Sequence, residues 1–122
     1  MMAEKARLCK DEATLEKILA AKSPAQAKAL GRTITGFDST LWDTHKSDIV
    51  TTGNLHKFSQ HEALRGFLLS TGNRVLVEAS PVDRVWGIGL AGNDAHIGNP
   101  LKWKGENRLG YALMEVRDLL SA

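Results

Sequence analysis

The sequence is short of several residue types, and each shortage excludes a class of protein. Cys9 is the only cysteine, so no disulfide can form within the chain, and a lone thiol fits a reducing cytosol. No apolar run approaches the roughly 18 residues that a membrane span needs, and the first residues lack the apolar core of a signal peptide. The net charge is only +2 and no cluster of Lys and Arg concentrates it, so charge gives no argument for nucleic-acid binding. We therefore expect a cytoplasmic protein that binds no membrane.

The length and the spacing of apolar residues predict one largely helical domain. The 122 residues are enough to bury a core, and we expect a single domain over residues 1–122. Asp11, Ser23 and Asp38 stand where N-cap residues are typical, whereas the first helix has no such residue before it. The expected helices cover residues 1–9, 12–21, 24–31, 39 to Gly53 or beyond, 61–70 and 106–120.

Residues 74–88 have the pattern of a β-hairpin. Apolar residues alternate along 74–79, as the two-residue period of a strand requires. The Ser-Pro-Val-Asp sequence at 80–83 is typical of a turn, and a second short strand is predicted over 84–88. Gly87 and Gly89 then allow the backbone to pass close to a ligand or another segment. The sequence therefore predicts a predominantly helical α+β domain, with about six helices around a small antiparallel hairpin.

The hairpin also holds the first candidates for a functional site. Asp83 lies three residues before Trp86, and a carboxylate partly desolvated by an indole is a candidate general base. The alternatives are a turn carboxylate that bonds the backbone and a tryptophan that is part of the core. Glu78 is expected to be a solvated strand residue, and His45 a hydrogen-bonded core histidine.

Other patterns either point to an anion or exclude a cofactor. Asn107 and Arg108 begin the last helix, where backbone N–H groups and an arginine can hold a phosphate, although they can equally be ordinary helix-start residues. The four histidines have no metal-ligand spacing, and the glycines after residue 86 match neither the dinucleotide-binding nor the P-loop pattern. We expect no metal and no cofactor.

Longer motifs resemble one protein family. Residues 76–90 read LVEASPVDRVWGIGL, and residues 103–110 read WKGENRLG and lead into ALMEVR at 112–117. Together they resemble the signature of the NADAR family, also called YbiA-like proteins. The opening MMAEKARL, the 27–32 stretch and Trp42 also follow the family's order, so the resemblance covers essentially the whole chain.

The resemblance implies an N-glycosidase without a cofactor. Family members are credited with cleaving the bond between a ribose and a nitrogen in riboflavin-pathway intermediates, and some with removing ADP-ribose from nucleobases. The implied ligand is therefore a phosphoribosyl or ADP-ribosyl small molecule, and nucleic acid is implied only as an ADP-ribosylated substrate. By motif, Asp83 and Trp86 are carried over as catalytic residues. The substrate-binding residues carried over are Trp42, Lys5, Arg32, Asn107 and Arg108.

One departure from the family pattern opens other functions. The family has a further N-terminal segment with aromatic pocket residues and a catalytic glutamate, and this chain starts after that glutamate. The missing N-cap before the first helix agrees with a truncated domain. The alternatives to an active enzyme are a module that binds ADP-ribose or a related nucleotide without cleaving it, and an inactive remnant.

The same departure suggests self-association. Met2, Ala6 and Cys9 have near-helical spacing, with Met1 and Leu8 on neighbouring faces. This apolar face would lose its cover without a preceding segment, and an exposed apolar patch usually finds a partner. We therefore expect a two-fold homodimer with the N-terminal helix at or near the interface.

Overall fold

The computed structural model describes residues 1–122 as two compact units, Met1–Ile49 and Val50–Ala122, and each is described by itself. All of its regular elements are helices, which confirms the prediction of a predominantly helical chain. None of these helices combines the length and the apolar character needed to cross a bilayer.

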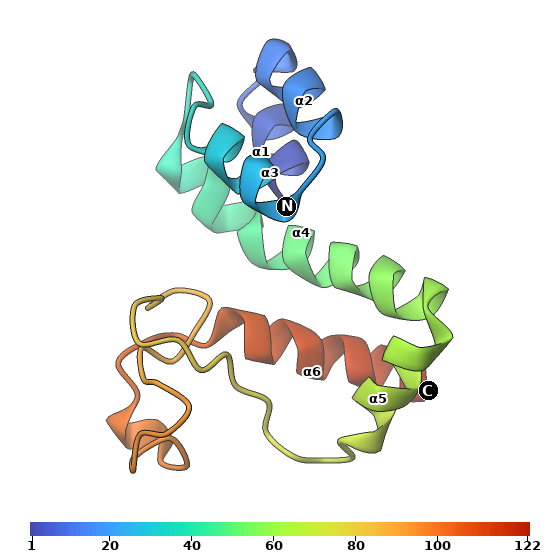
Figure 1. The fold of residues 1–122 in the computed structure, drawn as a ribbon, viewed down its shortest axis with the longest axis vertical. Helices are drawn as coiled ribbons and strands as arrows, with labels where there is room; N and C mark the ends of the chain where they lie inside the picture. The colour runs from blue at the N-terminus through green and yellow to red at the C-terminus, as the bar shows by residue number, and fades with distance from the viewer. The chain divides into compact units, whose positions relative to one another are not determined.

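The first unit is built on three short helices that pack against one another, α1 (Met2–Leu8), α2 (Glu12–Leu19) and α3 (Pro24–Gly31). Figure 1 shows them as a tight group at the blue end of the chain. Their core is formed by Ala6, Ile18 and Ile34, which are all buried. The predicted bounds of these helices agree with the observed ones to within two residues, because local spacing and caps determine them.

Part of the apolar face of α1 is covered within the unit, so less apolar surface is exposed than predicted. Ala6 is completely buried, and Met2 and Cys9 pack against the same core. Met2 also lies directly on Gly31, where a Cβ atom would collide with the Met2 sulfur. Met1, on a neighbouring face, is 50% exposed. The homodimer stays a prediction.

The predicted N-caps are confirmed. The Asp11 carboxylate accepts a hydrogen bond from the Thr14 N–H at 3.1 Å, and the Ser23 hydroxyl accepts one from the Gln26 N–H at 3.1 Å. Asp38 in turn accepts from the second and third residues of α4 (Ser39–Gln60), at 3.0 and 3.1 Å. This helix continues through Gly53, so the glycine does not end it.

The second unit holds the last part of α4, then α5 (Glu62–Ser70), the 3₁₀ turn η1 (Pro100–Lys102) and α6 (Arg108–Ser121). Figure 1 shows a long irregular segment that leaves α5, forms a group of loops and returns through α6, whose end lies beside α5. Ile88 from the loops and Val116 from α6 are completely buried.

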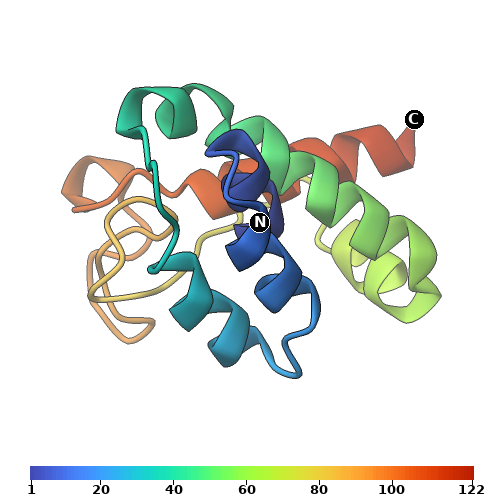
Figure 2. The same ribbon diagram turned by 90° about the horizontal axis from the view of Figure 1, so that it is seen from above.

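The predicted β-hairpin is not formed, and the fold is not α+β. No strand is found among residues 1–122, and Figure 2 also draws residues 74–90 as loop. Only one backbone hydrogen bond joins the two predicted strands, from the Ile88 N–H to the Glu78 carbonyl at 3.0 Å. A sheet needs a repeating ladder of such bonds, which is missing here.

The ladder of hydrogen bonds is missing because the backbone groups of the two predicted strands bond to other segments instead. The side-chain amide of Asn107 bonds both the carbonyl of Leu76 and the N–H of Glu78, as a neighbouring strand would. The carbonyls of residues 84–87 accept hydrogen bonds from the N–H groups of residues 106–109. Buried backbone groups must be paired, but nothing requires that a strand supply the pairing. The alternating pattern therefore predicted a sheet wrongly.

Candidate active site

The Asp83 carboxylate organises a tight turn. Its Oδ1 atom accepts hydrogen bonds from the Val85 N–H at 3.0 Å and the Trp86 N–H at 2.8 Å, and Oδ2 takes no part in either. The Asp83 N–H donates to the Ser80 hydroxyl at 3.1 Å. These bonds confirm the predicted turn chemistry of Ser80 and Asp83. The half-buried carboxylate is thus held in one orientation by its own loop.

The other side of this turn caps α6. The carbonyl oxygens of residues 84–87 accept from the backbone N–H groups of residues 106–109 at 2.9–3.1 Å. The first N–H groups of a helix have no partner inside it, so these carbonyls satisfy them. The oxygens also place partial negative charge at the positive end of the helix dipole. The turn that bears Asp83 and Trp86 is consequently fixed to the start of α6.

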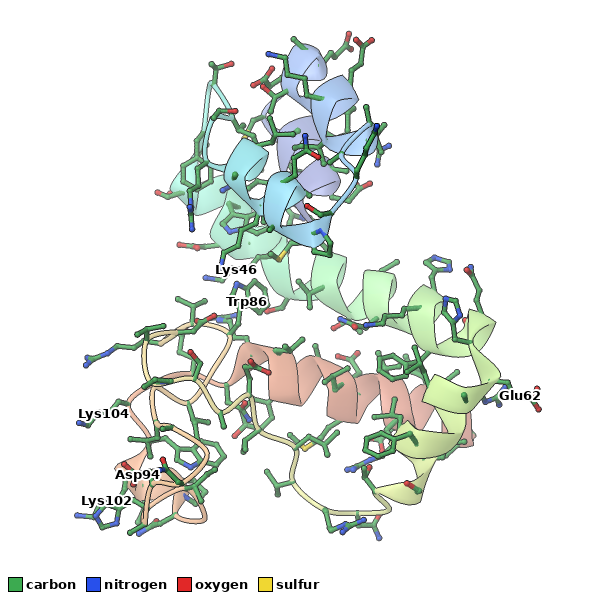
Figure 3. The ribbon with its side chains drawn as sticks, viewed as in Figure 1. Lys46, Glu62, Trp86, Asp94, Lys102 and Lys104 are labelled. Carbon is green, nitrogen blue, oxygen red and sulfur yellow. The ribbon has the colours of Figure 1, made fainter.

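Trp86 is half-buried on this turn. In Figure 3 its side chain extends from near the start of α6, away from the loop where Asp94 and Lys102 are labelled. Glu78 is exposed, as predicted for a solvated residue. His45 is exposed on α4, so the prediction of a core histidine is wrong.

Asn107 is the most enclosed polar residue of this region, with no exposed surface. Its Oδ1 accepts from the Glu78 N–H at 3.0 Å, and its Nδ2 donates to the Leu76 carbonyl at 2.9 Å. Its backbone has φ of 54°, in the left-handed region that Asn adopts more readily than most residues. All of these amide contacts are internal, and its predicted contact with a ligand stays a prediction.

The predicted anion site at the start of α6 loses its backbone donors. The N–H groups of Arg108 and Leu109 donate to the carbonyls of Val85 and Trp86, both at 3.1 Å. The Arg108 guanidinium lies beside the Glu106 carboxylate, with an Nε–Oε2 distance of 3.2 Å. A phosphate bound here would therefore lack these two backbone donors, and the role of Arg108 stays a prediction.

The first unit holds a cluster of side chains around Lys5. The Lys5 ammonium lies 4.7 Å from the ring centroid of Phe37 and 5.7 Å from that of Trp42. It also donates to the Gly31 carbonyl at the end of α3, at 3.4 Å. Both contacts stabilise a cation, one through the faces of aromatic rings and the other through the negative end of a helix. The cluster joins two of the predicted site residues, Lys5 and Trp42.

Phe37 was missed as a member of this cluster, although the sequence carries a signal for it. Phe37 precedes the capping residue Asp38, and Trp42 is the fourth residue of the helix that follows. This is the spacing of a hydrophobic staple, which brings two such side chains together. Arg32, the remaining predicted site residue of this unit, is exposed at the C-cap of α3.

A comparison with known proteins now decides the family. The NADAR domain matches residues 1–121, nearly the whole chain and both of its units. The chain belongs to the NADAR family. The resemblance noted from the motifs at 76–90 and 103–117 is thereby confirmed.

Three relatives of this NADAR chain show how far the similarity extends. N-glycosidase R617 of Acanthamoeba polyphaga mimivirus is 48% identical over 118 residues, which cover 97% of the chain and 69% of the relative. Protein irg-1 of Caenorhabditis elegans is 40% identical over 121 residues, covering 98% and 57%. N-glycosidase YbiA of Escherichia coli is 36% identical over 111 residues, covering 91% and 62%. The chain thus spans between 57% and 69% of the length of these relatives.

Proposed function

We propose that this NADAR domain hydrolyses the bond between a ribose and a nitrogen in a phosphoribosylated or ADP-ribosylated amine. Candidate substrates are early riboflavin-pathway intermediates and ADP-ribosylated nucleobases. The observation that carries the proposal is the similarity to relatives named N-glycosidases, which extends over 97% of the chain for the viral relative and 91% for the bacterial one. We also propose a cytoplasmic location, which the single, half-buried thiol of Cys9 supports.

The Asp83 turn supplies groups that suit this chemistry. Cleavage of an N-glycosidic bond passes through a sugar with oxocarbenium character, so a site must stabilise positive charge near C1 and position a water. Asp83 is held by two backbone N–H groups through Oδ1, which leaves Oδ2 for a water or for the sugar. Its role in the proposal is electrostatic partner or general base.

The remaining predicted residues have roles in binding. The indole rings of Trp86 and Trp42 are suited to stacking on a flat base. Lys5, Arg32 and Arg108 carry the positive charge that a ribose phosphate requires. The Lys5 ammonium lies over two aromatic rings and forms no salt bridge with a carboxylate, which favours an anion as its ligand.

A product assay tests the proposal. The purified chain is incubated with a phosphoribosylaminopyrimidine, and in parallel with an ADP-ribosylated nucleobase, and the release of ribose 5-phosphate or ADP-ribose is measured by chromatography. Release above the uncatalysed rate supports the N-glycosidase and identifies the substrate class. Absence of both products from a folded chain would contradict it.

A second candidate function is a module that binds ADP-ribose or a related nucleotide without cleaving it. The observation that favours it is the structural use of Asp83, because a carboxylate engaged by its own turn need not be catalytic. Calorimetric binding of ADP-ribose without any product would support the module. An inactive remnant predicts neither product nor a ligand-induced rise in melting temperature.

A further inference from the structure

We infer that Asn107 is a positioning residue that closes the neck of the loop carrying Asp83 and Trp86. The inference rests on the proposed function, since it names what holds the proposed catalytic turn in place. Here the neck means the two ends of the loop of residues 79–87, with residues 76–78 on the entry side and Gly87 and Ile88 on the exit side.

Asn107 forms hydrogen bonds with both sides of the neck. On the entry side its carboxamide oxygen accepts from the Glu78 N–H at 3.0 Å, and its amide nitrogen donates to the Leu76 carbonyl at 2.9 Å. On the exit side its backbone N–H donates to the carbonyl of Gly87 at 2.9 Å. The two sides are joined directly by the bond from the Ile88 N–H to the Glu78 carbonyl, at 3.0 Å.

The space around this junction leaves little room for another arrangement. A Cβ atom on Gly110, the third residue of α6, would collide with the Leu76 carbonyl and with the Asn107 amide. A Cβ atom on Gly87 would lie 2.9 Å from the carbonyl oxygens of both Glu78 and Asp83. Close packing of backbone on backbone means that the neck cannot shift without moving the turn at Asp83.

These contacts favour a positioning role over direct contact with substrate. The Asn107 side chain is completely buried, and both ends of its amide are bonded to backbone. The buried amide therefore has a partner at each end before any ligand arrives, and losing these bonds would leave the Leu76 and Glu78 groups unpaired. Small displacements of catalytic groups are costly, since about 1 Å can lower a rate on the order of 10²-fold.

The test replaces Asn107 with glycine, which removes the amide but keeps the left-handed backbone available. We expect amide hydrogen exchange at Trp86 and Ile88 to accelerate by about tenfold. This is the effect expected from the loss of one or two hydrogen bonds. Exchange within α1–α3 should not change. In the product assay, kcat should fall on the order of 10²-fold with KM nearly constant. Asn73→Gly is the matched control, because Asn73 is exposed in the turn after α5 and should leave exchange and kcat unchanged.

Two results would overturn the inference. One is wild-type exchange and wild-type kcat in Asn107→Gly. The other is a rise in KM at constant kcat, which indicates direct contact with the ligand. If Asn107→Gly does not fold, Asn107→Asp is measured in the same way, because it keeps an acceptor for the Glu78 N–H. A wild-type chain without turnover would contradict the proposed function alone, and the exchange rates would still decide the role of Asn107.

Discussion

The carboxylate of Asp11 accepts two hydrogen bonds from Thr35, one from its backbone N–H at 2.9 Å and one from its hydroxyl at 3.2 Å. The same carboxylate caps α2 through the Thr14 N–H. Asp11 therefore links the start of α2 to Thr35 through hydrogen bonds. Thr35 follows Ile34, a residue of the core of the first unit. One acidic side chain thus serves as a local cap and as a link between segments that are distant in sequence.

The first prediction concerns the pH dependence of this link. Hydrogen bonds from the Thr14 side chain and from the Thr35 and Thr14 backbone lower the pKa of Asp11 from 3.8 to about 2. Because the pKa is lower in the folded state, the ionised carboxylate stabilises the fold above about pH 4. That contribution should be lost as the pH falls from about 4 to about 2. Chemical unfolding at a series of pH values measures it.

The matched variants are Asp11→Asn and Asp118→Asn, since Asp118 is exposed on α6. Asp11→Asn should be less stable than wild type at pH 7, with a smaller loss of stability between pH 4 and 2. Asp118→Asn should follow the wild-type curve. Equal slopes for all three proteins would show that Asp11 does not contribute in this way.

The second prediction compares two glycines that both have open space around the position of a Cβ atom. Gly66 lies inside α5, whereas Gly72 follows it with φ of 63°. Gly66→Ala should raise the free energy of unfolding by about 0.5–1 kcal/mol, because alanine loses less backbone entropy in a helix. Gly72→Ala should lower it by about 1–2 kcal/mol, because left-handed backbone strains a residue with a Cβ atom. Urea unfolding of the two variants measures both changes, and changes of the same sign would contradict the argument.

The parts of the fold that the sequence predicted correctly are those governed by neighbours in the chain. Asp11, Ser23 and Asp38 each cap the helix that follows, because an N-cap bond reaches only two or three residues ahead. The turn at Asp83 follows the same logic, since its carboxylate bonds residues two and three positions later. Local geometry of this kind can be predicted from the residues alone.

The parts that failed depend on distant partners. The pairing of Leu76 and Glu78 is with Asn107, about thirty residues later, and no periodicity within 74–88 carries that information. Likewise Phe67 and Leu68 are neighbouring apolar residues of α5, but Phe67 is 73% exposed while Leu68 is buried. The spacing of apolar residues along a helix shows which of them share a face. Only the packing of other segments decides how many of those residues are buried.

The third prediction concerns catalysis by Asp83. Asp83→Asn keeps an oxygen that can accept from the Val85 and Trp86 N–H groups, so the turn should persist. It removes the charge and the capacity to take up a proton, which should lower turnover by a factor of about 10² to 10⁴ with ligand binding retained. The product assay and calorimetry measure the two effects separately.

Asp94 offers a matched control for this variant. Its carboxylate accepts from the His96 N–H at 2.7 Å, two residues ahead, as Asp83 does with Val85. Asp94→Asn should therefore cause the same local change in a different loop and leave turnover unaffected. Wild-type turnover in Asp83→Asn would remove this carboxylate from the mechanism.

The fourth prediction separates two roles for Trp86. If the indole stacks on the base of the ligand, Trp86→Leu should weaken binding by about 1–3 kcal/mol, the range for base–aromatic stacking. If it is mainly a core residue, Tm should fall strongly instead, while the affinity of the folded fraction stays the same. The half-buried position of Trp86 favours stacking, because the residue keeps some exposed surface. Trp103→Phe is the control, since the Trp103 indole N–H is used internally by the Ile97 carbonyl at 2.8 Å. Calorimetry with ADP-ribose and thermal unfolding of both variants decide the matter, and unchanged affinity in a folded Trp86→Leu variant counts against stacking.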